Sequence, residues 1–165
     1  AFDPNVRANL VTIEGVEEAY RARVDRALAS ASIVKISDED LAWVRPDTPT
    51  DQAARALLSQ TTRLVVVTAG SRGSTAFRAH QGRTHAVPLV HVDAPATQVV
   101  DTIGAGDSYL GALLTWLDES GLHTRAALDE MSDADVRDVL TFASRVAAIT
   151  CSRAGADPPR RAEFS

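Results

Sequence analysis

The chain has 165 residues, enough for one domain with a hydrophobic core. Its formal net charge of −5 argues against a nucleic-acid-binding surface, and no apolar run in the sequence approaches the length of a membrane-spanning helix. The single cysteine, Cys151, excludes an intrachain disulfide and suits a reducing compartment. We therefore expect a cytoplasmic protein that binds neither nucleic acid nor a membrane.

Strands that alternate with helices are predicted for the first half of the chain. Phe2 is typical of the end of a strand, and Asp3-Pro4-Asn5 of the turn that follows it. Runs rich in β-branched residues predict strands, whereas apolar residues at intervals of three and four predict helices. The expected strands are 32–36 and 63–68, and the expected helices are 16–28, 38–43 and 50–58.

The second half predicts a β-hairpin followed by two longer helices. Alternating segments at 74–79 and 84–88 form the expected hairpin, with Gln81-Gly82 as its turn. One helix is expected over 105–117. A last helix begins at Ser132, where the Ser-x-x-Asp spacing fits a capping box, and the tail after it is expected to be irregular.

The alternation of strands and helices implies an α/β fold, with a mostly parallel sheet covered by helices on both faces. In such sheets, ligands bind beyond the carboxyl ends of the strands. The polar loops after Ile36 and Thr68 lie at that edge, and so does the start of the helix over 105–117. We therefore expect a binding site there.

The central feature is Asp101-Thr-Ile-Gly-Ala-Gly-Asp107, which leads directly into that helix. The first amides of a helix have no intrahelical partners and lie at the positive end of its dipole. Because Gly104 and Gly106 have no side chains, an anion can approach these amides closely, with Asp107 beside it. This arrangement suits phosphoryl transfer. The alternative is a tight packing turn in which Asp107 only complements the helix dipole.

This segment resembles the second signature of the PfkB (ribokinase-like) carbohydrate kinases, Asp-Thr-x-Gly-Ala-Gly-Asp, at all six specified positions. The resemblance implies a three-layer αβα Rossmann-like ribokinase fold, here with a mostly parallel sheet plus the β-hairpin. It implies that Asp107 is the base that deprotonates a sugar hydroxyl, and that Gly104, Ala105 and Gly106 form the anion hole for the phosphate leaving ATP. The cofactors that it implies are ATP and Mg²⁺.

Thr68-Ala-Gly70-Ser-Arg-Gly73 is similar to the Thr-x-Gly-x-x-Gly segment that lines the nucleotide site in this family. The resemblance assigns Thr68, Gly70 and Gly73 to nucleotide binding. It adds Ser144, which stands where many relatives have Asn beside the adenine. Composition alone favours a simple glycine turn before the hairpin.

Ser37 and Asp40 stand where the family has Asn-x-x-Glu, which helps to organise magnesium and phosphates. The resemblance implies Ser37 at the nucleotide and Asp40 at Mg²⁺ through a water molecule, because Asp is one methylene shorter than Glu. Without the resemblance, Ser37–Asp40 is an acidic helix start. The Lys35-Ile-Ser37 form is similar to the fructokinase branch in particular.

Asp101 and the carbonyl of Ile103 match positions that hold a monovalent cation, often potassium, in several relatives. A hydrogen bond at the start of the helix is the alternative role for Asp101. Asp3-Pro4-Asn5-Val6-Arg7 resembles the Asp-Pro-Asn-x-Arg string of fructokinases and 2-keto-3-deoxygluconate kinases, which implies that Asn5 and Arg7 face phosphate or substrate. A proline turn is the alternative there.

The resemblance covers essentially all of residues 1–165 and identifies the chain as the C-terminal part of a single PfkB kinase domain, without the sugar-binding and lid half. The implied activity is ATP-dependent phosphorylation of a sugar, nearest to fructokinase, and the chain alone is expected to be inactive. The acceptor is open among fructose, 2-keto-3-deoxygluconate, ribose and a nucleoside, and a non-catalytic nucleotide-binding or structural fragment is a further alternative. A sheet without its first strands has an unpaired edge, which favours association, for example as a homodimer.

Overall fold

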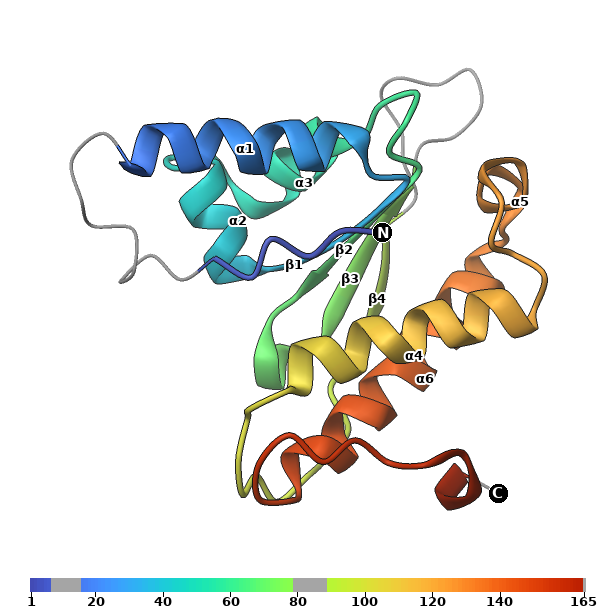
Figure 1. Ribbon diagram of the computed structural model, residues 1–165. Coiled ribbons are helices and arrows are strands. Elements are labelled where there is room, and N and C mark those ends of the chain that lie inside the picture. The colour runs from blue at the N-terminus through green and yellow to red at the C-terminus, as the bar shows by residue number, and fades with distance from the viewer. Residues whose placement is uncertain (7–15, 79–88, 165) are drawn as a thin grey trace. The chain divides into compact units, whose positions relative to one another are not determined.

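The computed structural model describes residues 1–6, 16–78 and 89–164 (Figure 1). Among these residues, one sheet has the strand order β1 (Ile33–Ser37), β2 (Leu64–Thr68), β3 (Ser74–Arg78) and β4 (Leu89–Val92). The helices are α1 (Val16–Ser30), α2 (Asp38–Val44), α3 (Thr50–Leu57), α4 (Ala105–Glu119), α5 (Arg125–Glu130) and α6 (Asp133–Cys151), and the short 3₁₀ segments are η2 (Gly70–Arg72) and η3 (Arg161–Phe164). Each helix in the described ranges is too short or too polar to span a bilayer. The predicted α/β class is confirmed.

The chain divides into two structural units. Unit 1 consists of Ala1–Ala69 and Thr75–Leu89. Unit 2 consists of Gly70–Ser74 and Val90–Ser165.

The parallel pair of β1 and β2 is the basis of unit 1. Its register runs from Ile33 opposite Leu64 to Ser37 opposite Thr68, so both strands end at the same level. Phe2 extends the pair through a parallel bridge to β1, in which its N–H donates to the Ile33 carbonyl at 2.9 Å. The strand geometry predicted for Phe2 is therefore confirmed.

Helices α1, α2 and α3 lie together on one side of β1 and β2 in unit 1 (Figure 1). The strand residues that join the helices in one core alternate along each strand, as the two-residue period of a β-strand requires. This core consists of Val24, Leu28, Ala31, Val34, Ile36, Leu41, Val44, Ala53, Ala54, Leu57, Val65, Val67 and Phe77. Removal of these apolar side chains from water is the main force that holds the helices to the strands.

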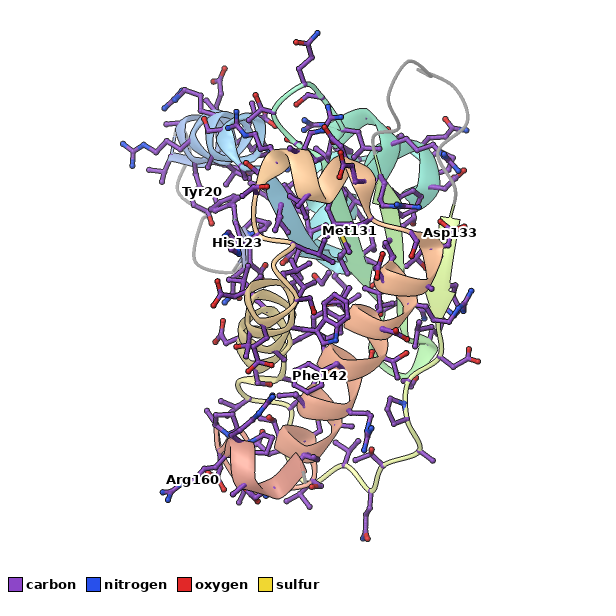
Figure 2. The ribbon with its side chains drawn as sticks, turned by 90° about the vertical axis from the view of Figure 1, so that its right-hand side faces the viewer. Tyr20, His123, Met131, Asp133, Phe142 and Arg160 are labelled. Carbon is purple, nitrogen blue, oxygen red and sulfur yellow. The ribbon has the colours of Figure 1, made fainter. Side chains whose placement is uncertain are left out.

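The antiparallel pair of α4 and α6 is the basis of unit 2 (Figure 1). Ser108 in the first turn of α4 contacts Thr150 near the end of α6, which gives the two helices opposite directions. Their buried apolar side chains are Tyr109, Ala112, Leu113 and Leu117 of α4 and Val136, Val139, Leu140, Ala143 and Val146 of α6. Met131 is the C-cap residue that follows α5, and it is buried at the turn into α6 (Figure 2).

The beginning of α6 confirms the capping box predicted from the sequence. Ser132 Oγ accepts the Asp135 N–H at 3.1 Å, and the Asp135 carboxylate accepts the Ser132 N–H at 2.8 Å. Two amides that the helix cannot pair internally are satisfied in this way. The sequence therefore locates the start of α6 to the residue.

The structure adds elements that the sequence did not predict. Of the expected hairpin, 74–78 forms β3, whereas the turn at Gln81-Gly82 and the segment 84–88 lie outside the described residues. Strand β4 has four residues and helix α5 has six, which is too few for a clear hydrophobic period. The tail contains the 3₁₀ segment η3 and is not wholly irregular.

Leu113 and Leu114 provide a test of the packing between α4 and α6. Leu113 is fully buried, whereas Leu114 on the same helix is 39% exposed. We expect Leu113→Ala to lower the free energy of unfolding by about 2–5 kcal/mol, because it leaves a cavity in the core. Leu114→Ala should lower it by less than about 1 kcal/mol. Urea denaturation measures both losses, and equal losses would contradict the packing described here.

Candidate functional site

Among the described residues, the turn before α4 leaves two backbone amides without partners. Gly104 is the N-cap residue and has no side chain to bond the first turn. The Ala105 N–H donates to the Thr102 carbonyl at 3.2 Å, within the turn before the helix. The first helical hydrogen bond runs from the Ser108 N–H to the Gly104 carbonyl at 2.9 Å. Within the described part of the chain, the N–H groups of Gly106 and Asp107 have no acceptor. They are available to an anion at the positive end of the helix dipole.

Glycine is required at position 104 for two reasons. Its φ of 79° lies in the left-handed region, which side chains other than glycine rarely adopt. In addition, a Cβ on Gly104 would lie 2.8 Å from the Cβ of Ala156. Ala156 belongs to the loop after α6, so this loop packs directly against the turn that carries the free amides.

Asp101 ties the same turn to the loop after α6. Its Oδ1 accepts the Ile103 N–H at 3.0 Å, and its Oδ2 accepts the Gly155 N–H at 2.9 Å. These backbone hydrogen bonds lower the pKa of Asp101 below its ordinary value. The hydrogen bond at the start of the helix, one of two roles that the sequence allowed, is therefore observed. Each carboxylate oxygen still has a lone pair with which it can bind a cation.

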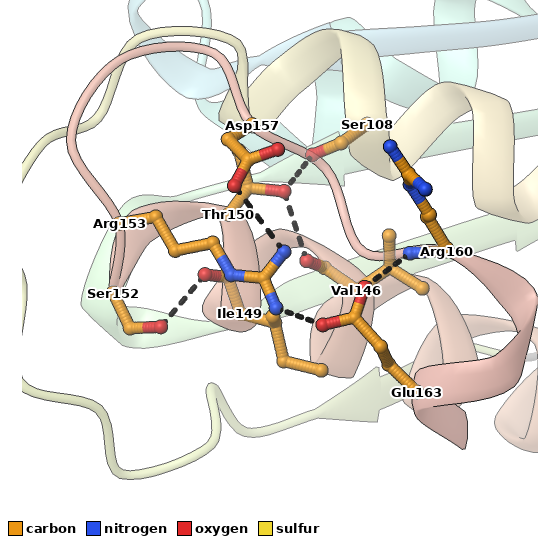
Figure 3. A network of polar contacts seen from close by, with 9 residues as sticks. All are labelled: Ser108, Val146, Ile149, Thr150, Ser152, Arg153, Asp157, Arg160 and Glu163. Carbon is orange, nitrogen blue, oxygen red and sulfur yellow. Dashed lines mark hydrogen bonds and ion pairs between the residues drawn. The ribbon is translucent and has the colours of Figure 1, made fainter. Parts of the chain in front are cut away.

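The Asp107 carboxylate is exposed in the first turn of α4, on the residue whose own N–H is free. The next residue, Ser108, is fixed by two hydrogen bonds. Its Oγ donates to the Ala105 carbonyl at 3.0 Å. The same Oγ accepts the Thr150 hydroxyl at 3.0 Å (Figure 3). Asp107 therefore combines an accessible side chain with a backbone that is anchored to α6.

Ion pairs hold the loop after α6 in place (Figure 3). The Arg153 guanidinium lies 3.5 Å from Asp157 and pairs with Glu163 in η3. The hydrogen bond from Arg153 lowers the pKa of Glu163, and the same contact raises the pKa of Arg153. These ion pairs link the two ends of the segment that contains Gly155 and Ala156, the two residues of this loop in contact with the turn before α4.

Gly70 and Gly73 serve different purposes in the turn around η2. Both have a positive φ, of 55° and 87°. In the described part of the chain, a Cβ on Gly70 would meet nothing within 4 Å, whereas a Cβ on Gly73 would lie 2.1 Å from the carbonyl oxygen of Val92. Gly70 thus leaves open space for a ligand, while Gly73 is needed so that the chain can pass close to β4.

Ser144 lies in the core of unit 2, where it hydrogen-bonds the phenol of Tyr109. The same phenol donates to Ser74 Oγ at 2.8 Å. Burial raises the pKa of Tyr109 to about 12, although its hydrogen bonds with Ser74 and Ser144 act in the opposite direction. The Ser144 hydroxyl is engaged within the protein, and its assignment to the nucleotide stays a prediction. This network could not be predicted from the sequence, because a buried tyrosine fits the apolar period of α4.

Ser37, Asp40 and Thr68 lie together in unit 1, at the carboxyl ends of β1 and β2. Ser37 and Thr68 are partners in the strand register, and Ser37 Oγ caps α2 by accepting the Asp40 N–H at 3.0 Å. The Asp40 carboxylate is partly buried and accepts the Val6 N–H. Burial raises the pKa of Asp40 above its ordinary value, against hydrogen bonds from Ser37 and Val6 that lower it. These three residues therefore lie at the carboxyl-end edge of the strands, where the sequence predicted the loops after Ile36 and Thr68.

A buried ion pair between Asp3 and Lys35 stands beside Asp40. Lys35 Nζ lies 2.8 Å from Asp3 Oδ2, and Asp3 Oδ1 accepts the Asn5 N–H at 3.2 Å. Asn5 has a φ of 41°, and residues 3–5 form a turn capped by the Asp3 side chain. This is the proline turn that the sequence offered as the alternative to phosphate or substrate binding by Asn5. Arg7, its expected companion at the phosphate or substrate, lies outside the described residues.

Comparison with known proteins places the chain among sugar kinases. Residues 2–162 match the profile of the family described as pfkB family carbohydrate kinase. "Probable fructokinase-3" of Arabidopsis thaliana is 37% identical over 162 residues, which cover 96% of this chain and 41% of that protein. The chain thus spans less than half the length of this curated relative.

Solved structures of fructokinases have the same fold. The fructokinase of Xylella fastidiosa with bound ATP has a TM-score of 0.79 and 25% identity, over 94% of this chain and 46% of that chain. The fructokinase of Vibrio cholerae O395, in its fructose, ADP and calcium ion bound form, has a TM-score of 0.69 and 28% identity, over 94% of this chain and 45% of that chain. The predicted ribokinase-like fold is confirmed by this similarity.

Gly104 and Gly111 allow a matched test of the turn before α4. Gly111 lies within α4, and a Cβ there would meet nothing within 4 Å. Gly111→Ala should raise the free energy of unfolding by about 0.5–1 kcal/mol, because alanine favours the helix. Gly104→Ala should lower it by about 1–3 kcal/mol, because of the left-handed φ and the contact with Ala156. Thermal denaturation of the two variants reads out the sign of each change, and a stabilising Gly104→Ala would disprove the close packing.

Tyr109 predicts a dependence of stability on alkaline pH. Its pKa is about 12 in the folded protein, compared with about 10 for an unfolded chain. Between these values the unfolded chain has lost a proton that the folded protein keeps, so stability is full below pH 10 and falls as pH rises toward 12. The loss attributable to Tyr109 is about 2–3 kcal/mol. Urea denaturation at roughly pH 9 and pH 11 should show a smaller decrease in Tyr109→Phe than in the parent and in Tyr20→Phe.

Proposed function

The chain belongs to the pfkB family of carbohydrate kinases, and on this basis we propose that the protein carrying it transfers the γ-phosphate of ATP to a hydroxyl group of fructose. The observation that carries the proposal is the free N–H groups of Gly106 and Asp107 beside the exposed Asp107 carboxylate. Family membership alone would not identify a working centre. An anion site and a base on adjacent residues of one helix turn supply what the transfer requires.

Phosphoryl transfer depends on alignment and on neutralisation of the charge that spreads over the moving group. The free amides at the start of α4 are fixed dipoles and need no reorganisation as that charge develops. Asp107 would accept the proton of the attacking sugar hydroxyl. A carboxylate is a weak base for an alcohol, but it suffices when the proton leaves late, as a loose transition state allows.

The oxygen donors in both units fit the cations that this reaction employs. Across the described ranges, three or more His, Cys, Asp or Glu side chains nowhere gather as they would around a tightly held metal. Asp40 offers a partly buried carboxylate, which suits Mg²⁺ held through water together with the nucleotide phosphates. Asp101 and the Ile103 carbonyl would hold a monovalent cation such as K⁺. Bound Mg²⁺ would supply charge neutralisation on the phosphates.

Gly70 in unit 2 is proposed to contact the nucleotide, and the same role is proposed separately for Ser37 and Thr68 in unit 1. Among the described residues, no atom lies within 4 Å of a Cβ on Gly70, which is consistent with the assignment of Gly70 to the nucleotide. The assignments of Gly73 and Ser144 to nucleotide binding remain proposals, although the close approach of Gly73 to Val92 and the hydrogen bond between Ser144 and Tyr109 give both residues a role in packing. Asn5 is kept as a candidate for phosphate or substrate binding.

Fructose is favoured over 2-keto-3-deoxygluconate, ribose or a nucleoside because the curated relatives are named fructokinases. We also propose that the chain forms the C-terminal part of one kinase domain in a cytoplasmic enzyme, and that the enzyme associates as a homodimer. The exposed Asp107 carboxylate beside free amides speaks against a non-catalytic fragment.

Replacement of Asp107 tests the proposed chemistry in the full-length protein. Asp107→Asn keeps the size of the side chain but cannot accept the proton, so fructose phosphorylation should fall by at least about 100-fold. The affinity for ATP, measured by titration calorimetry, should stay near that of the parent. The control is Asp118→Asn, which alters an exposed carboxylate near the other end of α4. Turnover by Asp107→Asn close to the parent's would rule out the assignment.

A further inference from the structure

Three buried hydroxyl groups meet in the core of unit 2. Tyr109 is 4% exposed, Ser74 is 2% exposed and Ser144 is 6% exposed. The Tyr109 hydroxyl donates to Ser74 Oγ at 2.8 Å and also hydrogen-bonds Ser144. The phenol thus joins α4 to α6 and to the beginning of β3. Ser74 precedes Tyr109 by 35 residues in the sequence, and Ser144 follows it by 35 residues.

Both ends of this link adjoin the proposed site. Tyr109 follows Asp107 by two residues in α4. Ser74 directly follows Gly73, at the end of the turn that begins with the open Gly70. One side chain therefore connects the turn proposed for the nucleotide with the helix whose start is proposed for the phosphate.

A second hydrogen bond anchors the neighbouring residue of α4. Thr150 of α6, which is fully buried, donates to Ser108 Oγ at 3.0 Å (Figure 3). Ser108 and Tyr109 are thus both tied to α6 by hydroxyl groups, directly after Asp107. Apolar packing by Leu113 and Leu117 holds the helices together, but it is not directional. Hydrogen bonds have a narrow range of length and angle, so they limit rotation and sliding of α4.

A tyrosine at position 109 is not what packing alone demands. Phenylalanine would fill the same space and would bury no hydroxyl group, whereas a buried hydroxyl must be paired to avoid an energetic penalty. The pairing serine residues on two other elements are themselves buried polar groups. An apolar core would also have held the helices together. The hydrogen-bond network additionally restricts the rotation and sliding of α4.

We propose that Tyr109 is a positioning residue, whose phenol sets the rotation and axial position of α4 and hence the place of the Gly106 and Asp107 amides relative to the turn at Gly70. The proposal rests on the proposed phosphoryl transfer. A displacement of about 1 Å in such a constellation is enough to reduce the rate by roughly 100-fold. Because Tyr109 is buried, it would act through α4 and not by direct contact with ATP or the sugar.

The test uses Tyr109→Phe in the full-length protein, with Tyr20→Phe as the matched control in unit 1. Tyr109→Phe should lower kcat for fructose phosphorylation by roughly 10–100-fold. The Kd for ATP, measured by calorimetry, should change much less. Hydrogen–deuterium exchange over 104–112 should become faster in Tyr109→Phe than in Tyr20→Phe. Parent-like kcat and exchange in Tyr109→Phe would overturn the proposal.

A triple variant separates positioning from core stability. Ser74→Ala/Tyr109→Phe/Ser144→Ala removes every unpaired hydroxyl that Tyr109→Phe leaves behind, so the melting temperature should return toward that of the parent. If Tyr109 positions α4, kcat stays low in the triple variant and exchange over 104–112 stays fast. Recovery of kcat together with the melting temperature would show that Tyr109 only fills the core.

The two proposals fail in distinguishable ways. If the parent phosphorylates neither fructose nor another sugar, the proposed function fails, but exchange over 104–112 still reports whether the phenol orders α4. If the parent is active and the exchange of Tyr109→Phe matches that of Tyr20→Phe, only the positioning role fails. Ser144→Ala alone serves as the control for a direct contact of this residue with ATP, because such a contact would raise the Kd for ATP without faster exchange.

Discussion

The N–H groups of Gly106 and Asp107 are free because the N-cap of α4 is a glycine. At the start of α6, the Ser132 hydroxyl bonds the amide three residues on, as an N-cap side chain usually does. Gly104 has no side chain for this purpose, and the nearby carboxylate of Asp101 bonds other amides. The proposed anion site thus depends on the absence of a capping side chain at Gly104. It also depends on Asp101, whose carboxylate accepts other amides and so leaves those of Gly106 and Asp107 free.

Asp40 in unit 1 and Asp101 and Asp107 in unit 2 differ because their local surroundings differ. Two backbone amides stabilise the charged form of Asp101 and lower its pKa, which makes it a fixed structural anion. Burial favours the neutral form of Asp40 and raises its pKa, so a nearby cation would restore its charge. Asp107 is exposed and has no side-chain partner among the described residues. Of the three, Asp107 alone is exposed, which suits its proposed role as the base.

The sequence was most informative where a feature depends on neighbouring residues. The turn before α4, the capping box at Ser132 and the end of the strand at Phe2 are all local, and the structure contains them. The parallel pairing of β1 and β2 agrees with the mostly parallel sheet expected from alternating strands and helices. Short elements such as β4 and α5 were missed, because their hydrophobic pattern is too brief to be distinguished from a loop.

Features that depend on tertiary contacts could not be read from the chain. The motif from Thr68 to Gly73 contains two glycines that look equivalent as letters. In the structure, Gly70 faces open space and Gly73 is wedged against the Val92 carbonyl, so one suits a ligand and the other suits the fold. Likewise, Ser144 occupies a position associated with the nucleotide, yet its hydroxyl bonds Tyr109 inside the core. A motif therefore fixes which residues meet at a site, whereas the partner of each side chain decides which of them are left to act on a ligand.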